Sequence, residues 1–198
     1  MDVQLPSSPI PIFPLPGAFL FPHQMLPLHV FEPRYRRMVG DLLDSPGRLV
    51  IGTQLATGVA ANGAPAVLPV AGLGEIVRHE RLDDGRFQIL VLGLLRVRIA
   101  EVPSDRLYRL VQCEPFEEID APLDEGQELS RDLRKATTAR LKQPLPLPES
   151  APASLLADLL LQTLRAPQTF VEQAFAEPSV ARRARLVLAA AAAAPPPE

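Results

Sequence analysis

Apolar residues alternate with polar residues or prolines along the first part of the chain, which is the two-residue period of β-strands. The period is clear over 26–30, and the runs 73–82 and 87–92 are also predicted strands. The turn Asp83-Asp84-Gly85 joins the last two runs into a predicted hairpin. Gly93 is predicted to break the second run. Further strands are predicted at 10–15, 48–54, 95–99 and 107–113.

Prolines shape two of these segments. Pro9, Pro11, Pro14 and Pro16 remove amide donors from the first strand, so it should pair along only part of its length or lie at an edge. Residues 57–66 carry no charge and are rich in alanine, glycine and proline. This composition predicts an exposed, mobile loop.

One early helix is predicted to begin at Pro33, because a proline at the first helical position loses no hydrogen bond. The residues after it repeat with the helical period, and the polar residues between them fall on the solvent side. The predicted apolar stripe is Tyr35, Met38, Val39, Leu42 and Leu43.

Beyond residue 122 the period changes to that of helices. We predict helices over 123–141, from a Ser154 cap to 164, from a capping box at 169–172 to about 175, and from a Ser179 cap to about 192. Leucines surround the second of these helices, so it should be the most buried. Residues 195–198 are predicted to be a disordered tail.

The predicted fold is therefore α+β, with a small, mostly antiparallel barrel and one early helix, followed by a helical subdomain. The predicted boundaries are 1–116 for the barrel, 117–194 for the helical subdomain and 195–198 for the tail.

Spaced motifs within residues 10–43 resemble the opening of the Lon N-terminal domain family, the substrate-recruiting part of ATP-dependent protease La. The motifs are Phe13-Pro14-Leu15-Pro16, Leu20-Phe21-Pro22, Leu26-Pro27-Leu28 and Phe31-Glu32-Pro33-Arg34-Tyr35. The segment 92–99 resembles a further family strand, Gly-x-x-Arg-hydrophobic-x-Ile. The Phe-Glu-Pro-Arg-Tyr version resembles short, free-standing bacterial Lon-domain proteins more than full proteases.

The resemblance implies a PUA-like barrel and a non-catalytic module that binds polypeptide or a protein partner. Such a chain lacks the ATPase and Ser-Lys peptidase domains of Lon, so we do not expect an enzyme. The alternatives are a PUA-like RNA-binding protein and a small-molecule-binding sensor. The binding candidates within the motifs are Phe21, His23, Phe31, Glu32, Arg34 and Tyr35.

The residues themselves show no catalytic set. There is no phosphate-binding Gly-x-x-x-x-Gly-Lys loop, and the three histidines are too few and too irregularly spaced for a metal motif. We therefore predict neither a metal nor a cofactor. Cys113 is expected to be a buried, inert thiol. The arginines of the first helix, and those at 182, 183 and 185, are interpreted as solvated helix faces, with binding of an anion or an acidic partner as the alternative.

Composition narrows the choice of partner and location. The chain has 198 residues, a formal net charge of −3 and a pI of about 5.7. This balance argues against nucleic acid as the partner. The sequence contains no membrane-spanning run and no secretory signal. One cysteine excludes an intrachain disulfide, and this fits the cytoplasm. The pattern carries no signal for an oligomeric state.

Overall fold

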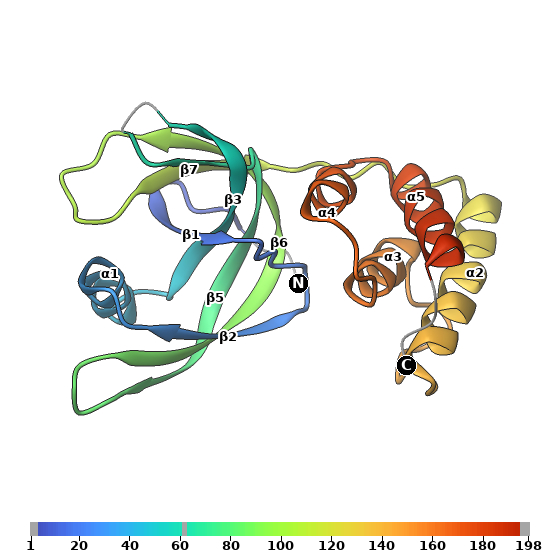
Figure 1. Cartoon of the computed structure of the whole chain (residues 1–198), viewed down its shortest axis with the longest axis horizontal. Helices are drawn as coiled ribbons and strands as arrows, with labels where there is room; N and C mark the ends of the chain where they lie inside the picture. The colour runs from blue at the N-terminus through green and yellow to red at the C-terminus, as the bar shows by residue number, and fades with distance from the viewer. Residues whose placement is uncertain (1–3, 61–62, 195–198) are drawn as a thin grey trace. The chain divides into compact units, whose positions relative to one another are not determined.

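Strands fill the first part of the chain and helices the second (Figure 1). The computed structural model describes residues 4–60 and 63–194. The chain divides into two compact units, Met1–Phe116 and Glu117–Glu198. In the first unit the described residues form one helix, α1 (Pro33–Leu43), and seven strands: β1 (Ile10–Pro16), β2 (Met25–Val30), β3 (Arg48–Val59), β4 (Pro65–Val67), β5 (Val70–Arg81), β6 (Phe87–Val102) and β7 (Leu110–Pro115).

All seven strands join one sheet, in which every pair is antiparallel except β1 with β3. The order is β1-β7-β6-β5-β3-β4, and β2 pairs with β6. Because β1 also pairs with β3, five strands are linked in a closed circuit of pairings. Each of the five contributes a fully buried side chain to one cluster: Ile12, Val50, Leu73, Val97 and Val111. The predicted combination of a largely antiparallel sheet, one early helix and a later helical part is confirmed.

β1 pairs only where its prolines allow. Residues Ile12 to Pro16 lie in parallel register with β3, whereas Ile10 and Pro11 lie opposite β7. The Ile12 N–H donates to the carbonyl oxygen of Arg109 over 3.1 Å. With each partner β1 thus pairs along only part of its length, as predicted, although the two registers together include all 7 residues of the strand.

α1 begins at Pro33, as the sequence predicts. The predicted apolar stripe faces the sheet, and four of its members are buried: Tyr35, Met38, Val39 and Leu42. They share a second core cluster with strand residues that include Phe13, Val30, Leu49 and Ile51. The helix therefore covers apolar side chains of the sheet that lie outside the first cluster.

The predicted loop at 57–66 is too long, because residues 57–59 and 65–66 belong to strands, whereas 60, 63 and 64 lie between the strands. β3 continues to Val59, β4 begins at Pro65, and the Ala60 N–H donates to the Ala64 oxygen over 2.8 Å. These residues are small and uncharged, so no side-chain alternation marks the strands, and backbone pairing alone defines them. Residues 61 and 62 lie outside the described part of the chain.

β6 runs through Gly93, although the sequence predicts a break there. A Cβ at this position would lie 2.0 Å from the Phe21 oxygen, so the glycine lets another segment approach the strand closely. The His23 N–H donates to the Gly93 oxygen, and the Gly93 N–H donates to the Gln24 oxygen, each over 2.8 Å. Gly93 is therefore a docking point for residues 20–24.

β7 begins at Leu110, three residues later than predicted. Leu107 is 71% exposed and Tyr108 only 4% exposed, so Leu107 does not share the buried environment of Val111 and Cys113. Residues 103–109 form a loop because the Tyr108 side chain turns toward α1, where its hydroxyl meets Asp41.

β2 forms an outer strand that pairs only with β6 among the described residues. The Gln24 oxygen accepts from Gly93, so alternate residues from Gln24 onward direct their backbone groups to β6. Met25, Pro27 and His29 consequently direct theirs outward. Pro27 has no N–H, so a gap interrupts the row of donors on this edge.

The second unit contains four helices within the described residues: α2 (Leu123–Leu141), α3 (Ala153–Gln162), α4 (Gln168–Phe175) and α5 (Val180–Ala193). Six of the ten residues of α3 are buried, and it packs against α2 and α5, which confirms it as the most buried helix. None of the described helices combines the length and apolarity needed to cross a membrane. The predicted tail at 195–198 lies outside the described residues.

One of the three predicted helix caps is confirmed. The Ser179 hydroxyl oxygen accepts from the Arg182 N–H over 3.3 Å at the start of α5. The other two are wrong, because α3 and α4 begin directly after Pro152 and Pro167, with no side-chain cap. The fixed φ of proline prepares the chain to enter a helix without help from a capping hydroxyl.

Arg183 is fully buried, which corrects its predicted place on a solvated face. Its Nη1 donates to Glu118 Oε1 over 2.6 Å and to the Glu177 oxygen over 3.2 Å. Its Nε lies 3.4 Å from Asp158 Oδ1. A buried charge requires such partners, so Arg183 links α5 to α3 and to the segment that precedes α2.

Candidate binding groove

The six predicted binding residues lie in two groups at opposite ends of β2. Two precede the strand and four follow it: Phe21 and His23, then Phe31, Glu32, Arg34 and Tyr35. A strand of six residues rises about 20 Å. The structure therefore does not bring the two groups into one site.

The first group forms a tight turn from Phe21 to Gln24. The Gln24 N–H donates to the Phe21 oxygen over 3.2 Å, and His23 has a φ of 64°. A proline at the second position and a positive φ at the third are typical of a type II turn. Phe21 is buried, with the Arg96 guanidinium 5.6 Å from its ring centroid. Phe21 is thus a core residue, and His23 is the accessible member of the pair.

The second group surrounds the start of α1. The Glu32 carboxylate does not cap the helix but accepts from Arg34 Nε over 3.0 Å. Arg34 lies 4.5 Å from the centroid of the Tyr35 ring, which packs 4.3 Å from Phe13. Burial raises the pKa of Tyr35 and keeps its hydroxyl neutral. Phe31 is 63% exposed. This group therefore combines a buried ring with accessible polar and aromatic groups.

An open groove of about 610 Å³ lies between the start of α1 and the loop 103–109. We call it the α1–loop groove. It is lined by Arg34, Tyr35, Ala60, Glu101, Val102 and most of the loop. Two of the predicted binding residues, Arg34 and Tyr35, therefore line a cavity.

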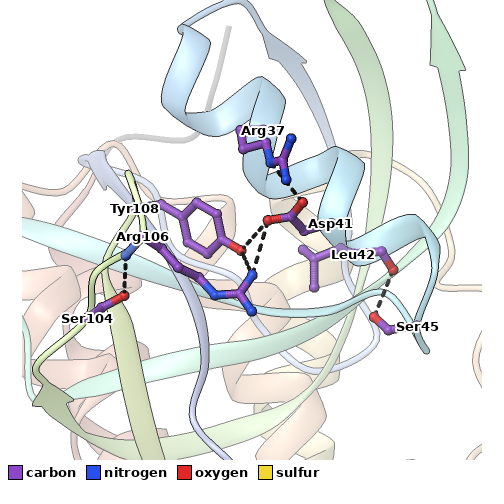
Figure 2. A network of polar contacts seen from close by, with 7 residues as sticks. All are labelled: Arg37, Asp41, Leu42, Ser45, Ser104, Arg106 and Tyr108. Carbon is purple, nitrogen blue, oxygen red and sulfur yellow. Dashed lines mark hydrogen bonds and ion pairs between the residues drawn. The ribbon is translucent and has the colours of Figure 1, made fainter.

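Asp41 of α1 holds the loop in place (Figure 2). Its carboxylate accepts from the Tyr108 hydroxyl over 2.8 Å and from Arg106 Nη1 over 3.1 Å, and Arg37 Nε lies 3.0 Å away. Burial, together with the Asp41 hydrogen bond, raises the pKa of Tyr108, so the hydroxyl remains a donor at neutral pH. The wall of the groove is thus anchored to the helix by charge-assisted hydrogen bonds.

The positive charges that line the groove are already neutralised. Arg109 donates to Glu101 through two nitrogens, and Arg34 and Arg106 have the carboxylate partners described above. Leu107, in contrast, leaves 71% of its surface exposed. The groove therefore offers apolar contact framed by paired charges, which suits a neutral or apolar segment better than a polyanion.

The histidines lie in a turn (His23), on β2 (His29) and on β5 (His79). Within residues 4–60 and 63–194, no three His, Cys, Asp or Glu residues lie close enough to hold a metal ion. His29 and His79 line a shallow groove of about 470 Å³ across β2, β6 and β5. Cys113 is buried, and this burial raises the pKa of its thiol to about 11. The predicted burial is confirmed, and the raised pKa disfavours the reactive thiolate.

Sequence reasoning missed four residues of the groove and its anchor: Asp41, Arg106, Leu107 and Tyr108. The helical period places Asp41 on the solvent side of α1. The other three residues lie in the strand predicted at 107–113 or directly before it. The available signal is the triplet Pro103-Ser104-Asp105, whose composition favours a loop at this point.

A family model described as the ATP-dependent protease La (LON) substrate-binding domain matches residues 9–195. Among curated relatives, Lon protease 2 of Sorangium cellulosum is 30% identical over 200 residues, which covers 93% of this chain and 25% of that protein. The Lon protease of Escherichia coli K12 is 26% identical over 96 residues, which covers 48% of this chain and 12% of that protein. The matched part of this chain thus spans 25% of the length of the Sorangium protein and 12% of the length of the Escherichia coli protein.

Two solved structures share the fold. The N-terminal domain of Mycobacterium avium complex Lon protease superposes with a TM-score of 0.70 at 16% identity, over 93% of this chain and 98% of that one. A Lon N-terminal domain protein from Xanthomonas campestris gives a TM-score of 0.64 at 22% identity, over 92% and 98%. The motif resemblance and the family match agree, and the chain belongs to the Lon substrate-binding domain family.

Proposed function

We propose that this chain is a non-catalytic binding module that holds segments of other polypeptides in the α1–loop groove. The observation that carries the proposal is the groove itself, with the exposed Leu107 beside neutralised arginines. The family's description as a substrate-binding domain supports the same role. In this proposal Tyr35 and Arg34 form the floor and rim, and Leu107 supplies apolar contact.

The proposal also includes the type of barrel, the division into domains and the cellular compartment. The closed circuit of β1, β7, β6, β5 and β3 corresponds to the PUA-like barrel, and residues 117–194 form a second, helical domain. The unpartnered, buried thiol of Cys113 fits a reducing compartment, and we propose the cytoplasm.

Binding of polypeptide is favoured over binding of RNA by the charge of the strand unit. Residues 1–116 contain 11 arginines and no lysine against 11 aspartates and glutamates, so their formal charge is 11 − 11 = 0. Counterion release on RNA requires an excess of cations. Paired charges around an apolar groove suit a polypeptide segment instead.

The test uses a fluorescein-labelled, permanently unfolded protein, such as reduced and carboxymethylated lactalbumin, and measures its anisotropy with the purified chain. Leu107→Asp places a charge where apolar contact is expected. Full burial of a leucine contributes about 1.5–3 kcal/mol, so the substitution should weaken binding about tenfold or more.

Val77→Asp is the matched control, because Val77 is an exposed aliphatic residue of β5 that does not line the groove. It should leave the affinity within about twofold of the parent chain. Equal affinities for the parent and both variants would overturn the proposal. So would displacement of the labelled protein by single-stranded RNA in a salt-sensitive manner.

A further inference from the structure

The helical unit contains a groove of its own, of about 590 Å³. One wall is a single face of α2, whose lining residues recur at helical spacing: Leu123, Gly126, Gln127, Ser130, Arg131 and Arg134. The facing wall consists of residues 120–121 and 149–154, together with Val180. We call this cavity the helical groove.

The segment that leads into α2 is fixed, so this groove is a built part of the unit. The Ile119 N–H donates to the Pro178 oxygen over 2.9 Å, and the Val180 N–H donates to the Ile119 oxygen over 3.0 Å. The buried Arg183 holds Glu118, one residue earlier. The position of residues 118–121 is thus set by a buried cation and two backbone hydrogen bonds.

Large apolar side chains stand exposed at one end of the helical groove. Leu123 lines it and is 76% exposed, and Ile119, beside the lining residue Asp120, is 62% exposed. Gly126 has no side chain to fill the groove. A Cβ added at this position would lie 3.7 Å from its nearest neighbour, Cβ of Ala121. Exposed apolar residues next to a cavity mark an interaction surface.

The two arginines that line the helical groove, Arg131 and Arg134, differ in whether their guanidinium groups have partners. Arg134 donates to the carbonyl oxygens of Leu147 and Pro148, and its Nε lies 3.8 Å from Glu149. The Arg131 side chain is exposed and makes no hydrogen bond or ion pair with any residue in the described part of the chain. It therefore offers a cation to a ligand.

The spacing of these features fixes the ligand's layout. Eight residues of α2 separate Leu123 from Arg131, a rise of about 12 Å. An extended chain covers this distance in about four residues. Asp120 lies at the Leu123 end of the groove and disfavours a second carboxylate there. The carboxylate of the ligand is thus directed to Arg131.

We propose that the helical groove binds an extended polypeptide segment in which an aliphatic side chain is followed, about four residues later, by a carboxylate. The aliphatic side chain packs on Leu123 and over Gly126, and the carboxylate accepts hydrogen bonds from Arg131. The site is separate from the α1–loop groove, so it goes beyond the function proposed above. The carboxylate belongs either to an acidic side chain or to a chain terminus.

The test measures the anisotropy of fluorescein-labelled peptides with the full chain. The first probe is the amidated peptide Gly-Leu-Ala-Ser-Ala-Glu-Gly, and the second has glutamine in place of glutamate. A third peptide, Gly-Leu-Ala-Ser-Ala with a free carboxyl end, distinguishes a terminal from a side-chain carboxylate. The glutamate or the free-acid peptide should bind about tenfold more tightly than the glutamine peptide.

Arg131→Glu should abolish that difference, and a lysine-containing peptide should then bind better than the glutamate one. Arg182→Glu is the matched control, because Arg182 is an exposed arginine of α5 that does not line the groove. Equal binding of the acidic and glutamine peptides to the parent chain would overturn the proposal, as would equal responses of the two variants.

Leu107→Asp separates this site from the α1–loop groove. The variant should retain the preference for the acidic peptide, whatever its affinity for unfolded lactalbumin. In ¹⁵N-labelled protein, the amides of 123–131 should shift on peptide addition. Shifts confined to 101–109, or loss of peptide binding in Leu107→Asp, would assign the peptide to the other groove and refute this one.

Discussion

Gly93→Ala tests whether the glycine docks the segment 20–24, as the backbone geometry indicates. The new Cβ would lie 2.0 Å from the Phe21 oxygen and 3.2 Å from Cγ of Leu20, so the turn must move away from β6. That movement breaks the two backbone hydrogen bonds between Gly93 and the turn. Each contributes about 0.5–1.5 kcal/mol.

The displaced turn also carries two core residues, Leu20 and Phe21, which are 1% and 3% exposed. Full exposure of such a side chain costs about 1.5–3 kcal/mol, and the displacement exposes part of each. We therefore expect Gly93→Ala to lower the free energy of unfolding by about 3 kcal/mol or more, since the backbone and core losses act together.

The composition provides a selective assay. The chain has two tyrosines and no tryptophan, and both Tyr35 and Tyr108 lie in the strand unit. Tyrosine fluorescence during urea unfolding therefore reports on that unit, while far-UV circular dichroism is dominated by the helices. The variant should shift the fluorescence transition to lower urea and leave the main dichroism transition in place.

Gly40→Ala is the matched control. Gly40 lies on the exposed face of α1, and nothing stands within 4 Å of a built Cβ. The substitution should stabilise the unit by about 0.5–1 kcal/mol, because glycine is a poor helix former. If Gly93→Ala unfolds within about 0.5 kcal/mol of the parent, which is the size of ordinary surface effects, the docking role assigned to Gly93 is refuted.

Three further predictions follow from buried polar groups. Arg183→Met should destabilise the helical unit by about 3–5 kcal/mol in unfolding followed by circular dichroism, because it removes the cation that pairs with the buried Asp158. Adding Asp158→Leu should restore part of the lost stability. If the double variant recovers none of it, the pairing is contradicted. Tyr108→Phe should cost about 1 kcal/mol at pH 7. The raised pKa of Tyr108 contributes stability that is present below pH 10 and lost as the pH rises further, so the variant should lose less stability than the parent above pH 10. At pH 8 the Cys113 thiol should react with Ellman's reagent about a hundredfold more slowly in the folded chain than in the urea-unfolded chain. The reason is that its folded-state pKa of about 11 lies about two units above the ordinary 9.0. Similar rates in the two states would show that the thiol is accessible.

Local periodicity predicts those elements whose side chains report their own environment. Tyr35, Met38 and Leu42 recur at helical spacing, and α1 forms where that spacing starts and ends. Residues 57–59 have no such pattern, since small uncharged side chains suit a loop and a strand equally. Their pairing with β4 depends on backbone contacts that a single sequence does not display.

The candidate grooves were less predictable, because their key contacts join residues that are far apart in the chain. Asp41 and Tyr108 are 67 positions apart, and nothing near either one marks the other as a partner. Arg183 shares its helix with two exposed arginines, and only the positions of Asp158 and Glu118 in space decide which arginine is buried. The motifs point to Arg34 and Tyr35. In the loop that faces them, the triplet Pro103-Ser104-Asp105 signals a loop but does not identify the residues that line the groove.

The gap at Pro27 bears on whether unfolded polypeptides, the proposed binding partners, can aggregate on the edge strand β2. Unfolded chains readily add themselves to any continuous row of backbone donors, and growth of that sort propagates into fibres. An outer strand whose donor row is broken in the middle cannot act as such a seed. In the proposed role, the interruption in β2 should therefore disfavour strand addition by extended partners at this edge.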